Sequence, residues 1–455
     1  MQKLFFVLLT VLSFTLVAAC GSTPGGDSDY NDERAYIDDD TLESFDLDLR
    51  ALSLAIAQSD AAKERAMSRK LSESARLYQA ALLSALHDDS STSRRTLAAV
   101  MLGFTGDATV ISPLLEKVQD EDEPESVRLN AVLGLSMLGD KLRDYEDHRA
   151  LMRTFAAGME NQDASFAMRR AAIQGYAVAF DGAQNDSILP LRDRFLSDRD
   201  VRVQIAAVNA MGDIGDTAAV PDLTLVGLDN PDADLRAASA VALGKIADPT
   251  RVLPALERAC MDESAIVRRH SIDAISKHYG SDPELVYATI ITGMSDFDPR
   301  VRESAAMALA RLNDARAIGA LLQATGDRTA LVREAAARSL GVLITEDREK
   351  ESYPLVGLLS DQNPGVQSAA LASLTSITRN DYGADQPRWR NYFHEKYPDL
   401  DPKNMYGDGP KPRVNSGISN SGSRRTSTYT QPRTTRTTNT RNTRNTRNTR
   451  NTRRR

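Results

Sequence analysis

The histidines of this 455-residue chain are the first candidates for metal or acid–base chemistry, and there are five of them: His87, His148, His270, His278 and His394. Only His394 is followed directly by a glutamate, Glu395. A metal centre needs several donor side chains that converge on one ion. Because no histidine has an acid at a matching spacing in a second segment, we predict no metal site and no cofactor. His270 and His278 lie about two turns apart on a helix, and we expect them to be solvated or to cap a helix end.

The two cysteines offer no catalytic pair. Cys260 lies in an apolar stretch, residues 256–261, which predicts a buried and inert thiol. The chain also has no phosphate-binding glycine loop and no Gly-x-Ser-x-Gly turn. The acidic run at residues 120–123 lacks the alternating spacing of a calcium loop. We therefore predict no catalytic residue, and we predict that the protein is not an enzyme.

A recurring arginine is the clearest pattern in the chain. It follows a valine, leucine or methionine in every copy but the first, where Ser93 precedes Arg94, and an alanine-rich stretch follows it in most copies. Successive copies lie 31 to 41 residues apart, and Gln367 replaces the arginine in the last one. The arginines could form a row that binds a ligand. We favour a structural role, because an arginine near an acidic helix start can bridge to the neighbouring repeat. These predicted repeat anchors are Arg94, Arg128, Arg169, Arg202, Arg236, Arg268, Arg302 and Arg333.

Each repeat divides into two predicted helices. An asparagine or aspartate before a proline predicts where the second helix starts, at Asn230, Asp298 and Asn363. Glycine is predicted to end the second helix, at Gly139, Gly212, Gly244 and Gly341. The first helix carries an early proline, at Pro113, Pro190, Pro221, Pro254 and Pro354. Self-similarity at this period indicates a stack of helical hairpins, each of which buries its apolar face against the next.

The residues 234–244 and 301–309 match the pattern Val-Arg-x-x-Ala-Ala-x-Ala-Leu-Gly almost letter for letter, and this pattern resembles the short bacterial type of HEAT repeat found in bilin lyases. The resemblance covers residues 90–380 or so. It implies an all-α, right-handed solenoid of about eight to nine hairpins. One iron hydroxylase uses the same scaffold with several His-Glu pairs, but this chain has only His394-Glu395. Nothing besides the repeat type favours a bilin lyase, and the scaffold serves many unrelated functions.

The first twenty residues predict export. A short positive start precedes fourteen mostly apolar residues, 4–17, which are too few to span a bilayer comfortably. Residues 17–20, Val-Ala-Ala-Cys, resemble a bacterial lipobox, which implies an acylated (palmitate-bearing) Cys20 as the mature N-terminus. The alternative is an ordinary secretory signal with an incidental cysteine. Gly21 rather than aspartate after Cys20 favours, by the same resemblance, the outer membrane over the inner membrane of a bacterial cell envelope.

Charge divides the chain further. Residues 411–455 hold thirteen lysines and arginines and no acid, which leaves a net charge of −20 on residues 1–410. We predict a signal peptide (1–19), an acidic flexible tether (20–48), an N-terminal helical cap (49–88), a solenoid with a C-terminal cap (89–398) and a disordered basic tail (399–455). The candidate polyanion-binding residues of the tail are Arg424, Arg425, Arg433, Arg436, Arg441, Arg444, Arg447, Arg450, Arg453, Arg454 and Arg455.

Two functions remain open on this evidence. The first is a membrane-anchored scaffold of the cell envelope that binds an unidentified envelope protein or peptide. The second is an envelope-organising or surface-adhesive protein whose tail binds anionic lipid, lipopolysaccharide or a wall polymer by counterion release. We do not expect nucleic acid as a partner, because nucleic acid lies in the cytosol and this protein is predicted to be exported. As an alternative to binding a partner, the basic tail could fold back and pair with the acidic body of the same chain.

Overall fold

The computed structural model describes residues 37–184 and 186–400 of the chain. Cys20 and every candidate arginine of the tail lie outside these residues. All regular elements in the described part are helices, so the predicted all-α class is confirmed. Among the same residues, no helix combines the length and apolarity that crossing a membrane requires.

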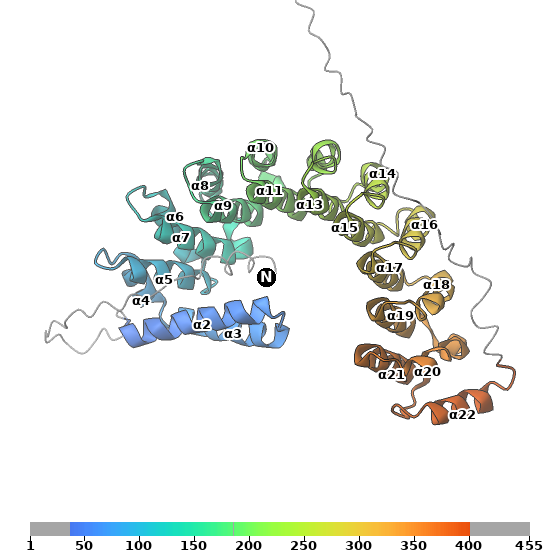
Figure 1. The fold of residues 1–455 in the computed structure, drawn as a ribbon. Helices are drawn as coiled ribbons and strands as arrows, with labels where there is room; N and C mark the ends of the chain where they lie inside the picture. The colour runs from blue at the N-terminus through green and yellow to red at the C-terminus, as the bar shows by residue number, and fades with distance from the viewer. Residues whose placement is uncertain (1–36, 185, 401–455) are drawn as a thin grey trace, which may run out of the picture. The chain divides into compact units, whose positions relative to one another are not determined.

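Within residues 37–400, apart from residue 185, nine helical hairpins follow one another. The second helices pack side by side in one row, and the first helices lie along one side of it (Figure 1). The second helices are α5 (Thr92–Gly103), α7 (Glu125–Met137), α9 (Phe166–Ala179), α11 (Val201–Ile214), α13 (Ala233–Leu243), α15 (Ala265–Ser276), α17 (Pro299–Leu312), α19 (Ala330–Leu343) and α21 (Pro364–Thr378). The first helices are α4 (Gln79–Leu86), α6 (Ile111–Gln119), α8 (His148–Glu160), α10 (Leu189–Ser197), α12 (Val220–Asp222), α14 (Pro249–Ala259), α16 (Pro283–Gly293), α18 (Ile318–Ala324) and α20 (Leu355–Leu358). The π-helical turn Leu223–Gly227 extends α12.

The N-terminal part corrects the predicted extent of the acidic tether. Helix α2 (Asp39–Ala57) begins within it, and α3 (Ala61–Leu77) follows. The side chain of Asp38 accepts the backbone N–H of Thr41, and further acids occupy the first turn, where they favour a helix start. Leu42 and Phe45 are buried. The tether was therefore predicted about ten residues too long, because its high acid content concealed a capped amphipathic helix.

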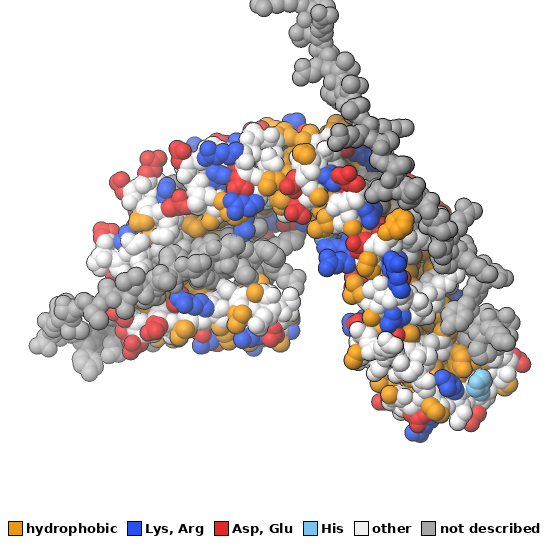
Figure 2. Space-filling view, in the orientation of Figure 1, with side chains coloured by type: hydrophobic (Ala, Val, Ile, Leu, Met, Phe, Trp, Pro, Cys, Tyr) orange, Lys and Arg blue, Asp and Glu red, His pale blue; other side chains and the backbone are white. Residues whose placement is uncertain are grey.

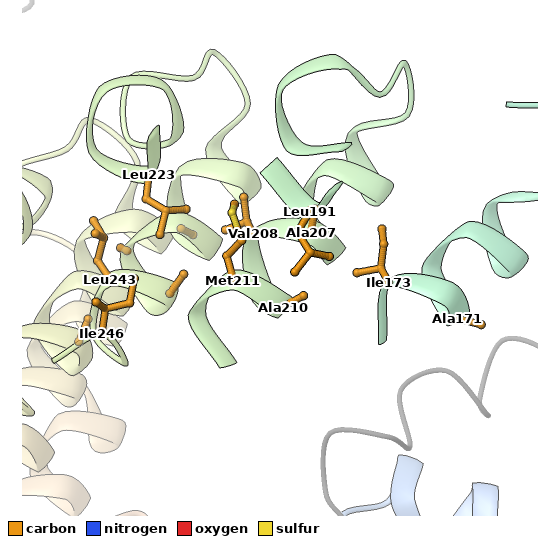
Figure 3. Close-up of a cluster of buried hydrophobic side chains, with 14 of the residues drawn as sticks. Ala171, Ile173, Leu191, Ala207, Val208, Ala210, Met211, Leu223, Leu243 and Ile246 are labelled. Carbon is orange, nitrogen blue, oxygen red and sulfur yellow. The ribbon is translucent and has the colours of Figure 1, made fainter. Parts of the chain in front are cut away.

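The core is one continuous apolar layer between the two rows of helices. Figure 3 shows its central part, where Leu191 of α10 and Leu223 of the π-helical turn lie close to Val208 and Met211 of α11. All four side chains are fully buried. Since each hairpin contributes only part of this layer, burial depends on the neighbouring hairpins.

The glycines of the second helices correct another prediction. Gly212 and Gly341 lie inside α11 and α19, where a Cβ would stand 2.7 Å from the Cβ of Ala242 and 2.4 Å from the hydroxyl of Ser373. Gly244 does follow the end of α13 directly, and a Cβ there would stand 2.6 Å from that of Ala274. These glycines therefore allow neighbouring second helices to approach closely. Gly139 follows the C-cap of α7 in the left-handed conformation with φ 58°, as predicted for a helix end, and Gly215 ends α11 in the same way with φ 75°.

The last hairpin is covered by α22 (Gln386–Lys396). Its Trp389 and Phe393 are fully buried, and the indole N–H of Trp389 donates to the carbonyl of Gly383 at 2.9 Å. The buried carboxylate of Glu349 accepts the hydroxyl of Tyr392 and the ammonium of Lys396, both at 2.8 Å. This face of the stack is thus closed by an aromatic layer and one ion pair.

Candidate protein-binding surface

The fourth residue of four consecutive second helices makes the same contact with the next hairpin. In α13, α15, α17 and α19 it is an arginine that donates two hydrogen bonds of 2.7–3.0 Å to an aspartate in the loop before the next second helix. A third hydrogen bond runs from Nη1 to a backbone carbonyl of the arginine's own hairpin. We call these contacts the inter-repeat pairs. They are Arg236–Asp262, Arg268–Asp296, Arg302–Asp327 and Arg333–Asp361.

The register of the row differs from the sequence prediction in two repeats. Arg94 and Arg202 are the third and second residues of their helices, and the fourth residues are Arg95 and Gln204. Arg202 bonds to Asp200 of its own helix start and lies 4.1 Å from the ring centre of Phe166. Helix start, rather than the Val-Arg motif, fixes which side chain reaches the next hairpin, because each residue rotates the helix face by about 100°.

The other positions of the row vary. Arg95 reaches buried Glu123 at 3.0 Å, and Arg169 makes one bond of 3.3 Å to Asp198. Gln204 and Gln367 replace arginine, and each donates to the carbonyl six residues before it, at 2.8 Å and 2.6 Å. Arg128 has a buried Nε without a hydrogen-bond partner. The row as a whole lies at helix starts, where most of its polar groups are used between repeats.

The exposed face of the second helices carries a groove between α17 and α19 with a volume of about 320 Å³. Three large apolar side chains line it: Met307 is 48% exposed, Leu331 39% and Val342 64%. Helices α17 and α19 pack against the rest of the stack through buried alanines on their other faces. The side chains of Met307, Leu331 and Val342 therefore face solvent and are not covered by another helix of the described part. Exposed apolar side chains that cluster in a groove are typical of a binding surface.

Charged side chains surround this apolar floor. Glu303 and Glu334 line the groove together with Arg311 and Arg338. Arg338 bonds Glu334 at 2.6 Å, and Arg311 bonds Asp273 of α15 at 2.6 Å. Burial is the main cause that raises the pKa of Glu303. Figure 2 shows hydrophobic side chains among charged ones of both signs on its visible face. An apolar centre with a mixed charged border is the usual anatomy of a protein interface.

The sequence pattern does not predict this groove. Met307 stands five residues after the fourth residue of α17, and the same position holds Asn209, Asp273 or Arg338 in some repeats but Leu133 or Val241 in others. The residue type at this position therefore does not set α17 apart. The repeat pattern alone does not reveal the groove, since the pattern leaves this position unspecified.

The described residues contain no group of three or more potential metal ligands, so no histidine belongs to such a group there. His148 is buried and hydrogen-bonds Asp186 at 2.8 Å. His278 is also buried rather than solvated, and burial is the main cause that lowers its pKa. Its side chain hydrogen-bonds the backbone of Leu243, the last residue of α13, which agrees with the predicted capping role. Cys260 is half-buried, and desolvation raises the pKa of its thiol to about 12, so the thiol is protonated at neutral pH.

These stacked hairpins define an α-solenoid, and the comparisons with known proteins identify its repeats. The HEAT-repeat family profile matches residues 152–244 and 287–375. HEAT repeats are therefore found in these two stretches, and the second contains the groove between α17 and α19. Solenoids of this kind commonly act as scaffolds for protein interactions. No curated protein sequence matches the chain significantly.

Three solved structures illustrate the structural similarity. An engineered protein is 16% identical over 71% of this chain and 95% of its own length, with a TM-score of 0.38. Yeast importin-beta is 13% identical over 87% of this chain, with a TM-score of 0.46, and the match spans only 59% of the importin. Human deoxyhypusine hydroxylase, solved in complex with glycerol, is 17% identical over 60% of this chain and 97% of its own, with a TM-score of 0.25.

Proposed function

We propose that this protein is a non-catalytic scaffold of a bacterial cell envelope, anchored by an acylated Cys20 at the outer membrane. Its solenoid binds a partner protein through the groove between α17 and α19. The observation that carries the proposal is the exposure of Met307, Leu331 and Val342 in one groove bordered by both signs of charge. The partner is a segment with apolar side chains at its centre and charged residues on both sides.

Site-specific photo-crosslinking in the full-length protein tests the groove. A photoreactive residue replaces Ala310, which lines the groove. Crosslinking is carried out in cells, and the crosslinked products are compared between the protein with Met307 and the Met307→Glu variant. A charge at Met307 must be desolvated on binding, so the specific crosslinked band should fall at least about tenfold. Leu225→Glu is the matched control, because Leu225 is 67% exposed on the π-helical turn, away from this groove. Equal loss in both variants, or no specific band, contradicts the proposal.

Membrane attachment has its own test. Cys20→Ser removes the acylation site, and each lost lipid methylene reduces membrane partitioning by about 0.8 kcal/mol. We expect the full-length variant to leave the membrane fraction, and mass spectrometry of the wild type to find an acylated mature N-terminus. A wild type that is not acylated, or a variant that stays in the membrane fraction, contradicts lipid anchoring and leaves the groove proposal intact.

The charge of the tail supports a second candidate function, polyanion binding at the envelope. Thirteen cations without an acid give a salt-sensitive affinity for any polyanion. Deletion of residues 411–455 should abolish salt-sensitive binding to vesicles that contain phosphatidylglycerol, while the crosslink near Met307 persists. If vesicle binding survives the deletion, the tail is not the polyanion site.

A further inference from the structure

One inter-repeat pair lacks its carboxylate. The loop residue that pairs with an arginine also accepts a backbone N–H two residues later, as Asp262 does from Ser264 at 2.8 Å and Asp296 from Asp298 at 2.8 Å. In the loop before α9, Asn161 accepts the N–H of Asp163 in the same way at 3.0 Å, although it stands five residues before the helix and not three. Arg128, the fourth residue of α7, lines one groove with Asn161, whereas Asp163 is exposed and does not line it. The polar residue beside Arg128 in this groove is therefore a neutral amide, where its counterparts bond an aspartate.

In the loop before α13, a neutral loop residue stands opposite a neutral side chain, whereas in the loop before α9 it stands beside an arginine. Asn230 is the equivalent amide in the loop before α13, where it accepts the N–H of Asp232 at 2.9 Å. The fourth residue opposite Asn230 is Gln204, which carries no charge. Among the described inter-repeat positions, an arginine faces an amide only at Arg128 and Asn161. The buried Nε of Arg128 is without a hydrogen-bond partner, as is that of Arg169, but Arg169 also bonds Asp198 through Nη2.

A groove opens at this position. It has a volume of about 390 Å³, and Arg128 and Asn161 line it together. Helices α6 and α8 contribute polar side chains, including Gln119, Thr154 and Arg153. Glu121 is the one acid in the lining, against the two arginines. The groove thus combines a net positive lining with hydrogen-bond donors, and Arg128 is one of the residues that line it.

We propose that this groove binds an acidic side chain of a partner peptide, whose carboxylate takes the place that an aspartate fills in the regular inter-repeat pairs. The geometry of those pairs gives the expected contact, in which Nε and Nη2 of Arg128 donate to the two carboxylate oxygens. Arg153 and the amides of the lining hold the flanking part of the peptide. This site is separate from the groove between α17 and α19, and it can exist whether or not that groove binds a partner.

The test uses the full-length protein and two fluorescent nonapeptides, one of alternating alanine and glutamate and one of alternating alanine and glutamine. Anisotropy measures their dissociation constants at physiological ionic strength. Asn161→Asp supplies the missing carboxylate from within the chain. Arg128→Gln removes the cation and installs the residue that α11 and α21 carry at the same position. Arg149→Gln is the control, because Arg149 is an exposed arginine of α8 that does not line the groove. The basic tail contributes the same background in every variant.

We expect the glutamate peptide to bind the wild type at least about tenfold more tightly than the glutamine peptide. Asn161→Asp and Arg128→Gln should each remove about tenfold of that affinity, and Arg149→Gln should leave it unchanged. Asn161→Asp should also raise Tm by about 2 °C, because it completes an internal ion pair. That rise separates a blocked site from a damaged fold. Equal affinity for both peptides, or equal losses in Arg149→Gln and Arg128→Gln, would overturn the proposal.

Discussion

The N-terminal and C-terminal hairpins solve the same packing problem with different contacts. From α13 to α19, each arginine of the row meets an aspartate, and the glycines Gly244 and Gly341 meet side chains of the next second helix. From α5 to α9, the row is irregular, and Gly103 meets the backbone of Gly134, where a Cβ on Gly103 would lie 2.5 Å from the carbonyl oxygen. The C-terminal hairpins are thus joined by repeated arginine–aspartate pairs, whereas α5 and α7 combine the Arg95–Glu123 pair with close backbone packing at Gly103 and Gly134.

This difference teaches where the solenoid can bind without losing stability. In a regular pair, Nε and Nη2 of the arginine bond the aspartate of the next hairpin and Nη1 bonds a backbone carbonyl of its own, so each nitrogen already has an acceptor. Where backbone packing holds the hairpins together, as at α5 and α7, the neighbouring pair can stay incomplete. Arg128 is available for this reason. In a repeat array, a position whose arginine lacks its aspartate is therefore a candidate ligand site, because the contacts of the neighbouring hairpins maintain the fold.

The strongest test of this comparison adds one methyl group. In Gly134→Ala the new Cβ would clash with the backbone carbonyl of Ala99, which cannot move without shifting α5. We expect the free energy of unfolding to fall by about 3 kcal/mol, as measured by urea denaturation. Gly319→Ala is the control: nothing lies within 4 Å of its Cβ, so this helical position should gain up to about 1 kcal/mol. A Gly134→Ala variant as stable as wild type would remove the backbone contact from the argument.

The next test reproduces the incomplete pair in the regular part. Burial raises the pKa of Asp327, but the hydrogen bonds from Arg302 and from the N–H of Thr329 outweigh it, so the pKa lies below its ordinary value. Such a group stabilises the fold above its unfolded pKa of about 3.9, and the contribution is lost as pH falls through the lower folded value. Asp327→Asn should therefore cost about 1–3 kcal/mol at pH 7.

The dependence of stability on pH in the acidic range tests this prediction. Thermal unfolding followed from pH 7 to pH 2 should show a difference in Tm between wild type and Asp327→Asn that shrinks as the medium becomes more acidic. Asp163→Asn is the control, since Asp163 is exposed in the loop that follows Asn161, and its Tm should match wild type throughout. A difference that stays constant with pH would assign the effect to shape rather than to the charge of Asp327.

Sequence reasoning could predict the stack, but only part of the site. The 31- to 41-residue period is a local property of the chain, so the hairpins and their number followed from it. The register of the arginine row required the helix starts, which the Val-Arg motif does not fix at Arg94 and Arg202. Asn161 could have been noticed by aligning the loops. The exposure of Met307 could not, because it depends on how closely α17 and α19 pack.

The smallest effect comes from building a pair where the chain has none. Gln204 and Asn230 are both neutral and half-buried, so neither side chain strains the fold. Gln204→Arg alone recreates the mismatch of Arg128, and Asn230→Asp alone leaves a carboxylate opposite an amide. Together they should form a regular pair, with a coupling energy of about 1 kcal/mol in a double-mutant cycle measured by urea denaturation. Additive single effects would mean that the loop before α13 does not bring its side chain to the row, and the equivalence between Asn230 and Asn161 would fail with it.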